Sequence, residues 1–581
     1  MSPTPGLTEA SLNTPSGRNH FWEPFHSKWC GMPLRSLLAV LFCLSALTPL
    51  AAAPPQPVLV LQAQPLGRLL GDLKELVRLT AAPGADEAAV RALVKGLEEA
   101  VGEKGFEGID LDRPLAVFAA LRDKQENHTL TLVVPVTTEK DFLDLIDRSG
   151  GRATPVEGKK GLFKLDLPAD IFANQSHVRI ADGWAYLEFN GDQIADPANL
   201  VPVANLIDPK ETAALVLRVF PDRVPAKMLK ATLDEIQHDL GQFKQFFPPD
   251  EAAVKKAIDT FIDEGLKLFR RTAETLHADA KAAAVRFHFD APTGDASLAV
   301  TVTPKPGTPL AKDVAARAPS AHRFAGLVQP DAALGYVWQW PLFSPESRAI
   351  VAAELEMNLA DLKKDVPEAA HPAIDELFKG LGRSAKAGDI DMAAAVYGPD
   401  KAGLFTAVAA VSCDDAPAVE KALRALAKKL PVQVVAFDAD KAEGVSIHRV
   451  MIPLEGNAAE FQPAFGKVAP LCVAFGPGAV YLGFGPEAMD RVKAALAVKP
   501  GPSPVASVTG VPARLTKLAG AAAGPKAGKF FGALIGTDGK PATGLTVTLA
   551  GGSELTLRVG VNVKYIPRLI VNADGDDIGK P

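Results

Sequence analysis

The chain of 581 residues has few cysteines and few large aromatic residues, with four Cys, five Trp and five Tyr. So few cysteines exclude a fold that depends on a network of disulfides. Basic residues are not in excess either, because 62 Lys and Arg stand against 68 Asp and Glu, a formal net charge of −6. The charge therefore gives no basis for binding nucleic acid or an anionic lipid surface.

Sequence motifs for hydrolysis, metal binding and phosphate binding are also missing. The sequence has no GxSxG elbow, no HExxH motif and no paired CxxC motifs, and its ten histidines are scattered. These motifs place a nucleophile, a zinc ligand pair or a zinc cage at a fixed spacing. We therefore predict no catalytic residue, no cofactor and no metal site.

Residues 1–53 have the layout of a signal peptide. The 14 residues Leu37 to Leu50 are apolar or small, follow Lys28 and Arg35, and precede three alanines. This run is short for a membrane span. We expect export to the periplasm or the extracellular space, and the alternative is an uncleaved N-terminal membrane anchor. Removal of this segment leaves Cys413 and Cys472, which we expect to be two buried thiols rather than a bridged pair.

The most informative feature is an internal repeat. Residues 177–190 (HVRIADGWAYLEFN) resemble residues 472–485 (CVAFGPGAVYLGFG), with the sequence Tyr-Leu-x-Phe beginning at Tyr186 in one and at Tyr481 in the other. Each segment holds two β-rich runs around a Gly turn, which predicts a β-hairpin. The repeat predicts two copies of one unit.

The surrounding elements follow the same order in both copies: strand, two helices, strand, strand, helix, strand and hairpin. Adjacent strands joined by short turns must be antiparallel. We therefore predict an α+β fold of two tandem antiparallel β-meander units covered by helices. The expected boundaries are 54–305 for the first repeat, 306–329 for a linker and 330–581 for the second repeat.

The first repeat contains an element that the second copy does not fully match. Apolar residues at steps of three and four predict an antiparallel αα-hairpin at about residues 225–278. We expect it to pack on its own sheet, and the alternatives are a homodimer arm or a lid over a groove. In the second copy we expect one short helix at most in residues 512–523, and a strand at residues 529–535.

Three aromatic residues are the strongest indication of binding. Tyr336, Trp338 and Trp340 alternate along one predicted strand, so their side chains share a face. An exposed row would stack on sugars or cover a hydrophobic ligand, whereas a buried row would fill the core of the second copy. Burial is the interpretation that the statistics of large aromatic residues favour.

Two further groups of polar residues could carry chemistry. The pairs Asp110/Asp112 and Asp389/Asp391 occupy equivalent places in the two copies and could hold Ca²⁺ or act as acid and base, although turn residues at a strand start explain them as well. Arg286, His288 and Asp290 share one face of a predicted strand. They could bind a ligand, and a solvated outer face is the simpler explanation.

The order of elements, the twin hairpins and the signal peptide resemble a family of secreted bacterial tandem α+β proteins of unknown function. The resemblance implies no catalytic residues. The leading hypothesis is a non-enzymatic periplasmic or cell-envelope protein that binds or scaffolds a component there. The alternatives are a carrier of lipid or another hydrophobic ligand, and a hydrolase or carbohydrate-active enzyme that uses Asp112 or Asp391.

Overall fold

The computed structural model describes residues 56–80, 86–102, 104–121, 129–166, 176–189, 191–243, 252–341, 345–365, 367–387, 389–428, 435–535 and 544–563. The expected signal peptide, residues 1–53, lies outside this part of the chain. The described residues form an α+β fold around one large antiparallel sheet, so the predicted class is confirmed.

The first half of the chain contributes ten strands to this sheet. From the outer edge inward they run β4-β5-β6-β7-β3-β2-β1-β8-β9-β10, and every neighbouring pair is antiparallel. Their bounds are β1 (Leu59–Ala63), β2 (Leu115–Ala120), β3 (Thr129–Pro135), β4 (Arg152–Pro155), β5 (Leu162–Asp166), β6 (Ser176–Ala181), β7 (Trp184–Phe189), β8 (Leu215–Val219), β9 (Ala280–Asp290) and β10 (Asp295–Pro304).

The second half contributes ten strands in the matching order, β15-β16-β17-β18-β14-β13-β12-β20-β21-β22. Their bounds are β12 (Ala332–Pro341), β13 (Asp389–Tyr397), β14 (Thr406–Ser412), β15 (Val435–Ala442), β16 (Val445–Pro453), β17 (Val468–Gly476), β18 (Ala479–Phe484), β20 (Ala506–Gly510), β21 (Leu545–Ala550) and β22 (Leu555–Asn562). This order is what a duplication would produce. That the halves superpose, Tyr186 on Tyr481, stays a prediction.

The two halves join through their last strands. β10 pairs with β22 over eight residue pairs, from Asp295 opposite Asn562 to Val302 opposite Leu555. The sequence suggested two separate sheets, and this pairing makes them one continuous sheet of twenty strands. Backbone hydrogen bonds therefore cross the junction as they cross any other strand pair.

The repeated hairpins form where the sequence predicts them. Asp182 and Gly183 both have positive φ (52° and 74°), as a two-residue turn with the right-handed strand twist requires. In the second hairpin Gly478 has φ 66°. The turns fix the register, so that Tyr186 pairs with Arg179 in the first hairpin and Tyr481 with Ala474 in the second.

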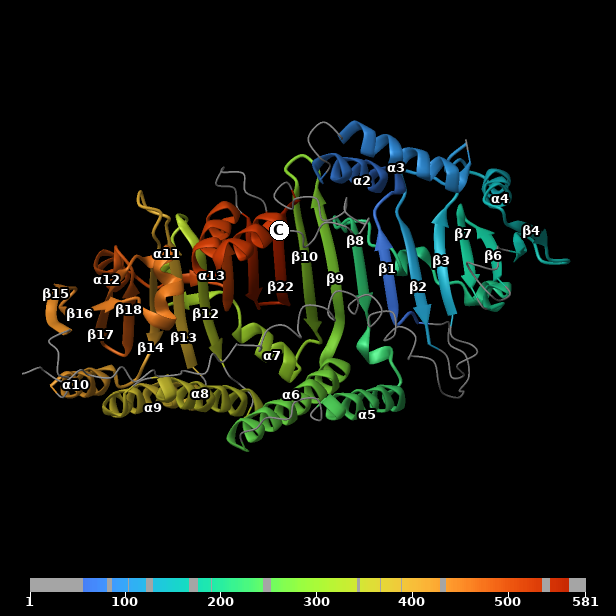
Figure 1. Cartoon of the computed structure of the whole chain (residues 1–581). Helices are drawn as coiled ribbons and strands as arrows, with labels where there is room; N and C mark the ends of the chain where they lie inside the picture. Colours follow the sequence, from blue (N-terminus) through green and yellow to red (C-terminus); the bar gives the residue numbers. More distant parts are fainter. Residues whose placement is uncertain are drawn as a thin grey trace, which may run out of the picture.

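Helices follow equivalent strands in the two halves (Figure 1). After β1 come α2 (Leu66–Thr80) and α3 (Asp86–Val101), and after β12 come α8 (Pro345–Asp365) and α9 (His371–Ala387). The remaining helices are α4 (Glu139–Arg148), α5 (Ala226–Phe243), α6 (Ala252–Asp279), α7 (Pro309–Ala316), α10 (Ala416–Ala427), α11 (Gln462–Phe465), α12 (Ala488–Leu496) and α13 (Pro512–Ile535).

The core divides into clusters on both faces of the outer strands. In the first half, α4 packs Phe142 and Ile146 against β5, β6 and β7, while short 3-10 turns bring Ile194 and Leu206 onto the opposite face. In the second half, α10 and α12 take the corresponding positions. The outer strands are thus covered on both faces.

The structure corrects the expectation for residues 512–535. The predicted strand at residues 529–535 is helical and belongs to α13. Gly524, with φ 85° and ψ 169°, interrupts this helix, and Gly520 and Gly528 then lie side by side, so the chain folds back on itself. Since α13 connects β20 to β21 as α5 and α6 connect β8 to β9, the αα-hairpin does have a shorter counterpart.

The predicted linker is also structured. It contains α7, whose N-cap Thr308 accepts a hydrogen bond from the Ala311 amide, and β11 (Ser320–His322), which pairs with β19 (Gly501–Ser503). The linker therefore contacts both halves, since α7 packs on α6 and β10 whereas β11 pairs with β19.

Candidate ligand-binding site

The central strands separate apolar from polar side chains by simple alternation. On β10, Leu298 and Val300 point to one face while Ala299 and Thr301 point to the other, because successive residues of a strand alternate. The register places Val300 opposite Val285 of β9 and Leu557 of β22. Directly opposed residues share a face, so the apolar side chains of neighbouring strands line up across the sheet.

Following the registers outward gives one apolar surface that crosses both halves, here called the apolar floor. Its residues are Leu59, Leu61 and Ala63 of β1; Leu215, Leu217 and Val219 of β8; Ala283, Val285 and Phe287 of β9; Leu298, Val300 and Val302 of β10; Leu555, Leu557 and Val559 of β22; Val547 and Leu549 of β21; Ala506 and Val508 of β20; and Tyr336 and Trp338 of β12. Of these side chains only Tyr336 and Trp338 carry a polar atom.

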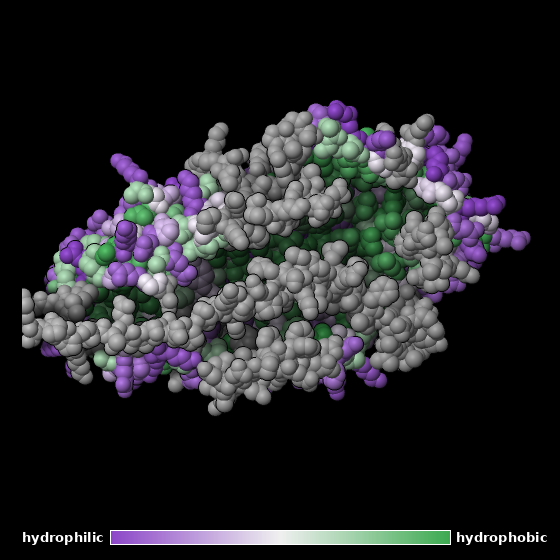
Figure 2. Space-filling model, viewed as in Figure 1, coloured by the Kyte–Doolittle hydropathy of each residue, from purple (hydrophilic) through white to green (hydrophobic). Residues whose placement is uncertain are grey.

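The apolar floor is accessible to solvent at its centre. Leu298, Leu557 and Leu215 are 44%, 40% and 39% exposed. In a sheet whose face is packed against a layer of helices, such residues would be buried. Figure 2 shows hydrophobic side chains deep in a hollow between the upper and lower helices. A contiguous exposed apolar surface of this kind is a candidate binding surface.

Helices stand along the margins of the apolar floor rather than over its centre (Figure 1). α2 and α3 pack mainly on each other at one margin, next to the strands of the first half. At the other margin α6 packs extensively against α8, a helix of the second half. α13 covers one end of the β12 and β20 region, where Leu515 lies against Gly510.

The contact of α6 with α8 bears on the prediction of a homodimer arm at residues 225–278. Both predicted helices form, as α5 and α6, and Arg270 of α6 lies 2.9 Å from the Asp234 carboxylate of α5. The more extensive contact of α6, however, is with α8. This helix links the two halves within one chain, and the homodimer stays a prediction.

The aromatic row lies on the apolar floor. The rings of Tyr336 and Trp338 are tilted against each other with centroids 5.8 Å apart, and both side chains are half-buried. Burial, with Glu354 of α8 as a smaller cause, raises the pKa of Tyr336 to about 12. The side chain of Trp340 lies outside the described residues. The two described rings are thus neither fully exposed nor part of a closed core. They form the end of the apolar floor at β12.

Asp391 has a structural position in the second half. Its Oδ2 accepts a hydrogen bond from the Arg323 amide, and its Oδ1 lies 2.9 Å from His322 Nε2, although the angles of this close contact are not those of a hydrogen bond. The Phe324 amide donates to His322 Nδ1, so the neutral ring carries its proton on Nε2, facing Asp391. His322 is fully buried. This carboxylate holds the linker onto β13.

Asp112, its counterpart in the first half, is exposed in the turn before β2. Its amide donates to Asp110 Oδ1 at 3.1 Å, which is a local turn contact. The side chain of Asp389 lies outside the described residues. The structure therefore does not bring the acids predicted in the two copies together, and neither Asp112 nor Asp391 lies on the apolar floor.

Cys413 and Cys472 are free and buried, as expected. Burial raises the pKa of both thiols. Within the described residues, no group of three or more His, Cys, Asp or Glu side chains is arranged to hold a metal ion. Nor does this part of the chain contain a helix with the length and apolar composition needed to cross a bilayer.

Sequence reasoning placed Tyr336 and Trp338 on one strand face, as the structure does, but it did not point to the central part of the apolar floor; ligand binding by these residues stays a prediction. The alternation of Leu298, Val300 and Val302 with Ala299 and Thr301 does predict a strand with one apolar face. Such a pattern normally indicates a face buried in a core. Nothing in the sequence shows that the helices of both halves leave this face uncovered.

No protein-family model matches the sequence, and no curated protein matches it. Among solved structures, two crystal forms of TP0453 resemble the chain. Form IV is 11% identical in sequence, with a TM-score of 0.20, over 44% of this chain and 81% of that one. Form I is 10% identical, with a TM-score of 0.19, over 44% and 79%.

Proposed function

We propose that the protein binds a long-chain hydrophobic ligand, such as a lipid, on the apolar floor. The observation that carries this proposal is the continuous row of apolar side chains across the junction of the two halves, in which Leu215, Leu298 and Leu557 are exposed and the β9 residues are partly buried. Transfer of apolar surface from water is favourable by roughly 25 cal/mol per Å². A hydrocarbon chain lying on the floor therefore gains binding free energy without any specific polar contact.

The dimensions of the floor favour a long ligand. From β1 to β12 it spans seven strand spacings, or about 34 Å at roughly 4.8 Å for each spacing. The hydrocarbon core of a bilayer is about 30 Å thick, so one acyl chain in a leaflet extends about 15 Å. The floor is thus about two acyl chains long. Its side chains offer hydrogen bonds only at Tyr336 and Trp338, so the polar group of the ligand lies near these residues or beyond the floor.

Export forms part of the proposal and is supported by the apolar run Leu37–Leu50. A carrier of lipid in the periplasm or outside the cell would need such a segment. N-terminal sequencing of the protein from the cell-envelope fraction tests this point. A chain that begins near Pro54 is expected, and a chain that begins at Met1 or Met32 would contradict cleavage.

Binding is tested by native mass spectrometry of purified residues 54–581, followed by titration with a fluorescent fatty acid. We expect co-purifying lipid and saturable binding of the probe. The variant Leu298→Asn places an amide at the centre of the floor and should weaken probe binding about tenfold or more, since a buried Leu contributes about 1.5–3 kcal/mol.

Val468→Asn is the matched control, because Val468 of β17 is 52% exposed and lies on the opposite face of the sheet. It should leave the affinity unchanged. A protein free of lipid that also fails to bind the probe would refute the proposal. An equal loss in both variants would show that the floor is not the site.

A further inference from the structure

The opposite face of the sheet carries a polar groove at the junction of the halves. It has a volume of about 430 Å³ and is lined by His288 of β9, Ser297 of β10, Arg558 of β22 and Thr546 of β21. The register aligns His288 with Ser297, and Gly560 with both Ser297 and Thr546. β9, β10 and β21 thus place hydrogen-bonding side chains along one row, and Arg558 of β22 stands in the adjacent row, opposite Ala299.

Small residues form the bottom of this groove. Ala299 of β10 pairs with Arg286 on one side and with Arg558 on the other, so two arginines flank an alanine. In the next row Gly560 has no room for a side chain, because a Cβ atom there would lie 2.7 Å from Thr546 Oγ1. The larger side chains stand around a hollow that has ample room for a small polar group.

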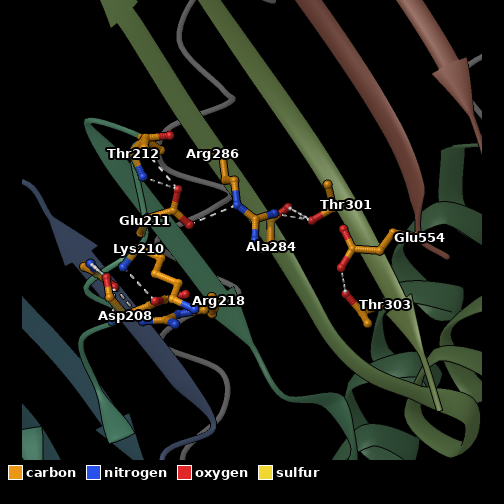
Figure 3. Close-up of polar contacts among 12 residues, drawn as sticks. Asp208, Lys210, Glu211, Thr212, Arg218, Ala284, Arg286, Thr301, Thr303 and Glu554 are labelled. Atoms are coloured by element: carbon orange, nitrogen blue, oxygen red, sulfur yellow. Dashed lines mark hydrogen bonds and ion pairs between the residues drawn. The ribbon is translucent and has the colours of Figure 1, made fainter. Parts of the chain in front are cut away.

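The two arginines, Arg286 and Arg558, differ in their partners, and Figure 3 shows the partners of Arg286. Arg286 Nε lies 3.1 Å from Glu211 Oε2, and its Nη1 donates to Thr301 Oγ1 at 2.6 Å. Arg558 is exposed to the groove, and no carboxylate of the described residues lies within ion-pair distance of it. The groove therefore contains one guanidinium group without an ion-pair partner among the described residues, and the carboxylates of Asp290 and Asp295 line the groove farther along.

The acidic residues in and near the groove have hydrogen-bond partners other than Arg558. Glu211 also accepts hydrogen bonds from the Thr212 and Ala213 amides, which together with Arg286 lowers its pKa despite its burial. Asp295 accepts from the Asn562 side-chain amide, and Asp290 accepts from the Thr293 hydroxyl. Asp290 and Asp295 both lie at the turn end of the groove, beyond His288 and Ser297.

We propose that this groove binds a small anionic group, a phosphate or a carboxylate, held by Arg558 with Ser297, Thr546 and His288. Arg558 supplies a fork of N–H donors that matches both anions, and charge-assisted hydrogen bonds of this kind are about twice as strong as neutral ones. The site lies on the face opposite the apolar floor and does not depend on the proposed lipid binding.

His288 provides a built-in reporter. Burial lowers the pKa of His288, and the charges of Arg558 and Arg286 lower it further, while Glu211 acts in the opposite direction. A bound anion neutralises Arg558 and favours the imidazolium form. Anion binding should therefore raise the pKa of His288, and conversely affinity should increase as the pH falls.

The test titrates residues 54–581 with inorganic phosphate and with acetate, and separately with vesicles that contain phosphatidic acid. His288 is followed by NMR and binding by calorimetry. In the variant Arg558→Gln, affinity for the anion that binds should fall about tenfold or more, and the upward shift of the His288 pKa should disappear. Arg152→Gln, on the edge strand β4, is the matched control and should bind as the unchanged protein does.

Binding of free phosphate or acetate that Arg558→Gln weakens identifies a soluble anion as the ligand. Binding to vesicles alone, weakened in the same way, identifies a lipid headgroup. If none of the three probes binds, or if the two variants bind equally well, the site is refuted. Leu298→Asn should leave anion binding unchanged, so a failure of the apolar floor and a failure of this groove remain distinguishable.

Discussion

The two repeated hairpins pair their strands in the same way and are covered differently. In β6–β7 the third residue of Tyr-Leu-x-Phe is Glu188, and in β18 it is Gly483. A short run of 3-10 turns, Gln193–Ala195, Pro197–Asn199 and Val203–Asn205, lies over the first hairpin, whereas α12 lies over the second.

The difference at this position accounts for both arrangements. Glu188 is fully buried, and its Oε2 accepts a hydrogen bond from the Ile194 amide at 3.0 Å, which fixes the first turn. At Gly483 a Cβ atom would lie 2.7 Å from both Ala488 O and Val492 Cγ2. A side chain there would push α12 off the strands. The comparison teaches that one position on the hairpin decides what can pack on it: a glycine leaves room for a helix, whereas a buried glutamate binds the amide of a 3-10 turn.

The largest effect is expected from Gly483→Ala, which introduces that Cβ atom against the backbone of α12. Because a backbone oxygen cannot move aside at low cost, we expect a loss of about 3 kcal/mol in the free energy of unfolding. Denaturant unfolding followed by circular dichroism measures it. Gly382→Ala, in the open interior of α9, is the control and should stabilise by about 0.5–1 kcal/mol. Similar changes in the free energy of unfolding for the two variants would refute close packing of α12 on Gly483.

Removal of the paired acids should also affect the two halves differently, with a larger loss of stability in the second half. Asp391→Ala leaves buried His322 without its carboxylate and removes the acceptor of the Arg323 amide, so a loss of about 2 kcal/mol is expected. Asp112→Ala, at the equivalent exposed turn, should change stability by less than about 0.5 kcal/mol. Thermal unfolding of both variants measures the difference. A larger effect at Asp112 would reverse our assignment of their roles.

The smallest effect, and the one that depends on pH, is expected from Glu188→Gln. Burial is the main cause that raises the pKa of Glu188, against the opposing Gln193 and Ile194 amides and His177; Asp192 raises it further. A raised pKa means that the folded state favours the protonated acid. The associated stability is present below the unfolded pKa, near 4.5, and is lost as the pH rises through the folded pKa.

Glutamine mimics the neutral acid at every pH. The melting temperatures of the variant and the unchanged protein should therefore agree below about pH 4.5, and the variant should become relatively more stable as the pH rises. A difference that does not change with pH would show that Glu188 ionises in the fold as freely as in water. The second half has Gly483 at this position, so the packing of α12 on its hairpin should not depend on pH through this residue.

Much of the strand content could be predicted from the sequence. The Gly turns and the alternation of apolar residues located both hairpins, the strands around them and the α5–α6 pair, because these signals are local. The error at residues 529–535 has a physical origin. KFFGALI is a short apolar run, and periodicity alone does not distinguish a strand from a buried helix over such a length.

The candidate site could be predicted only in part. The alternation in β12 placed Tyr336 and Trp338 on one face, and that in β9 placed Arg286 and His288 on one face, as the registers confirm. The two rows are connected through β10, β22, β21 and β20. Strand pairing between residues more than 250 positions apart leaves no local signal, so the apolar floor and the polar groove emerge only once β10 and β22 are paired.

The β10–β22 seam also has a consequence for how the chain matures. β10 ends at Pro304 and its partner begins at Leu555, so 251 residues must be made before the seam can close (555 − 304 = 251). At a synthesis rate of about 5–20 residues per second, the edge of β10 stays unpaired for roughly 13–50 s next to the apolar floor. An open edge of that kind is a template for aggregation. Until β22 is made, the backbone groups of residues 295–304 that it will pair with remain open next to the apolar floor.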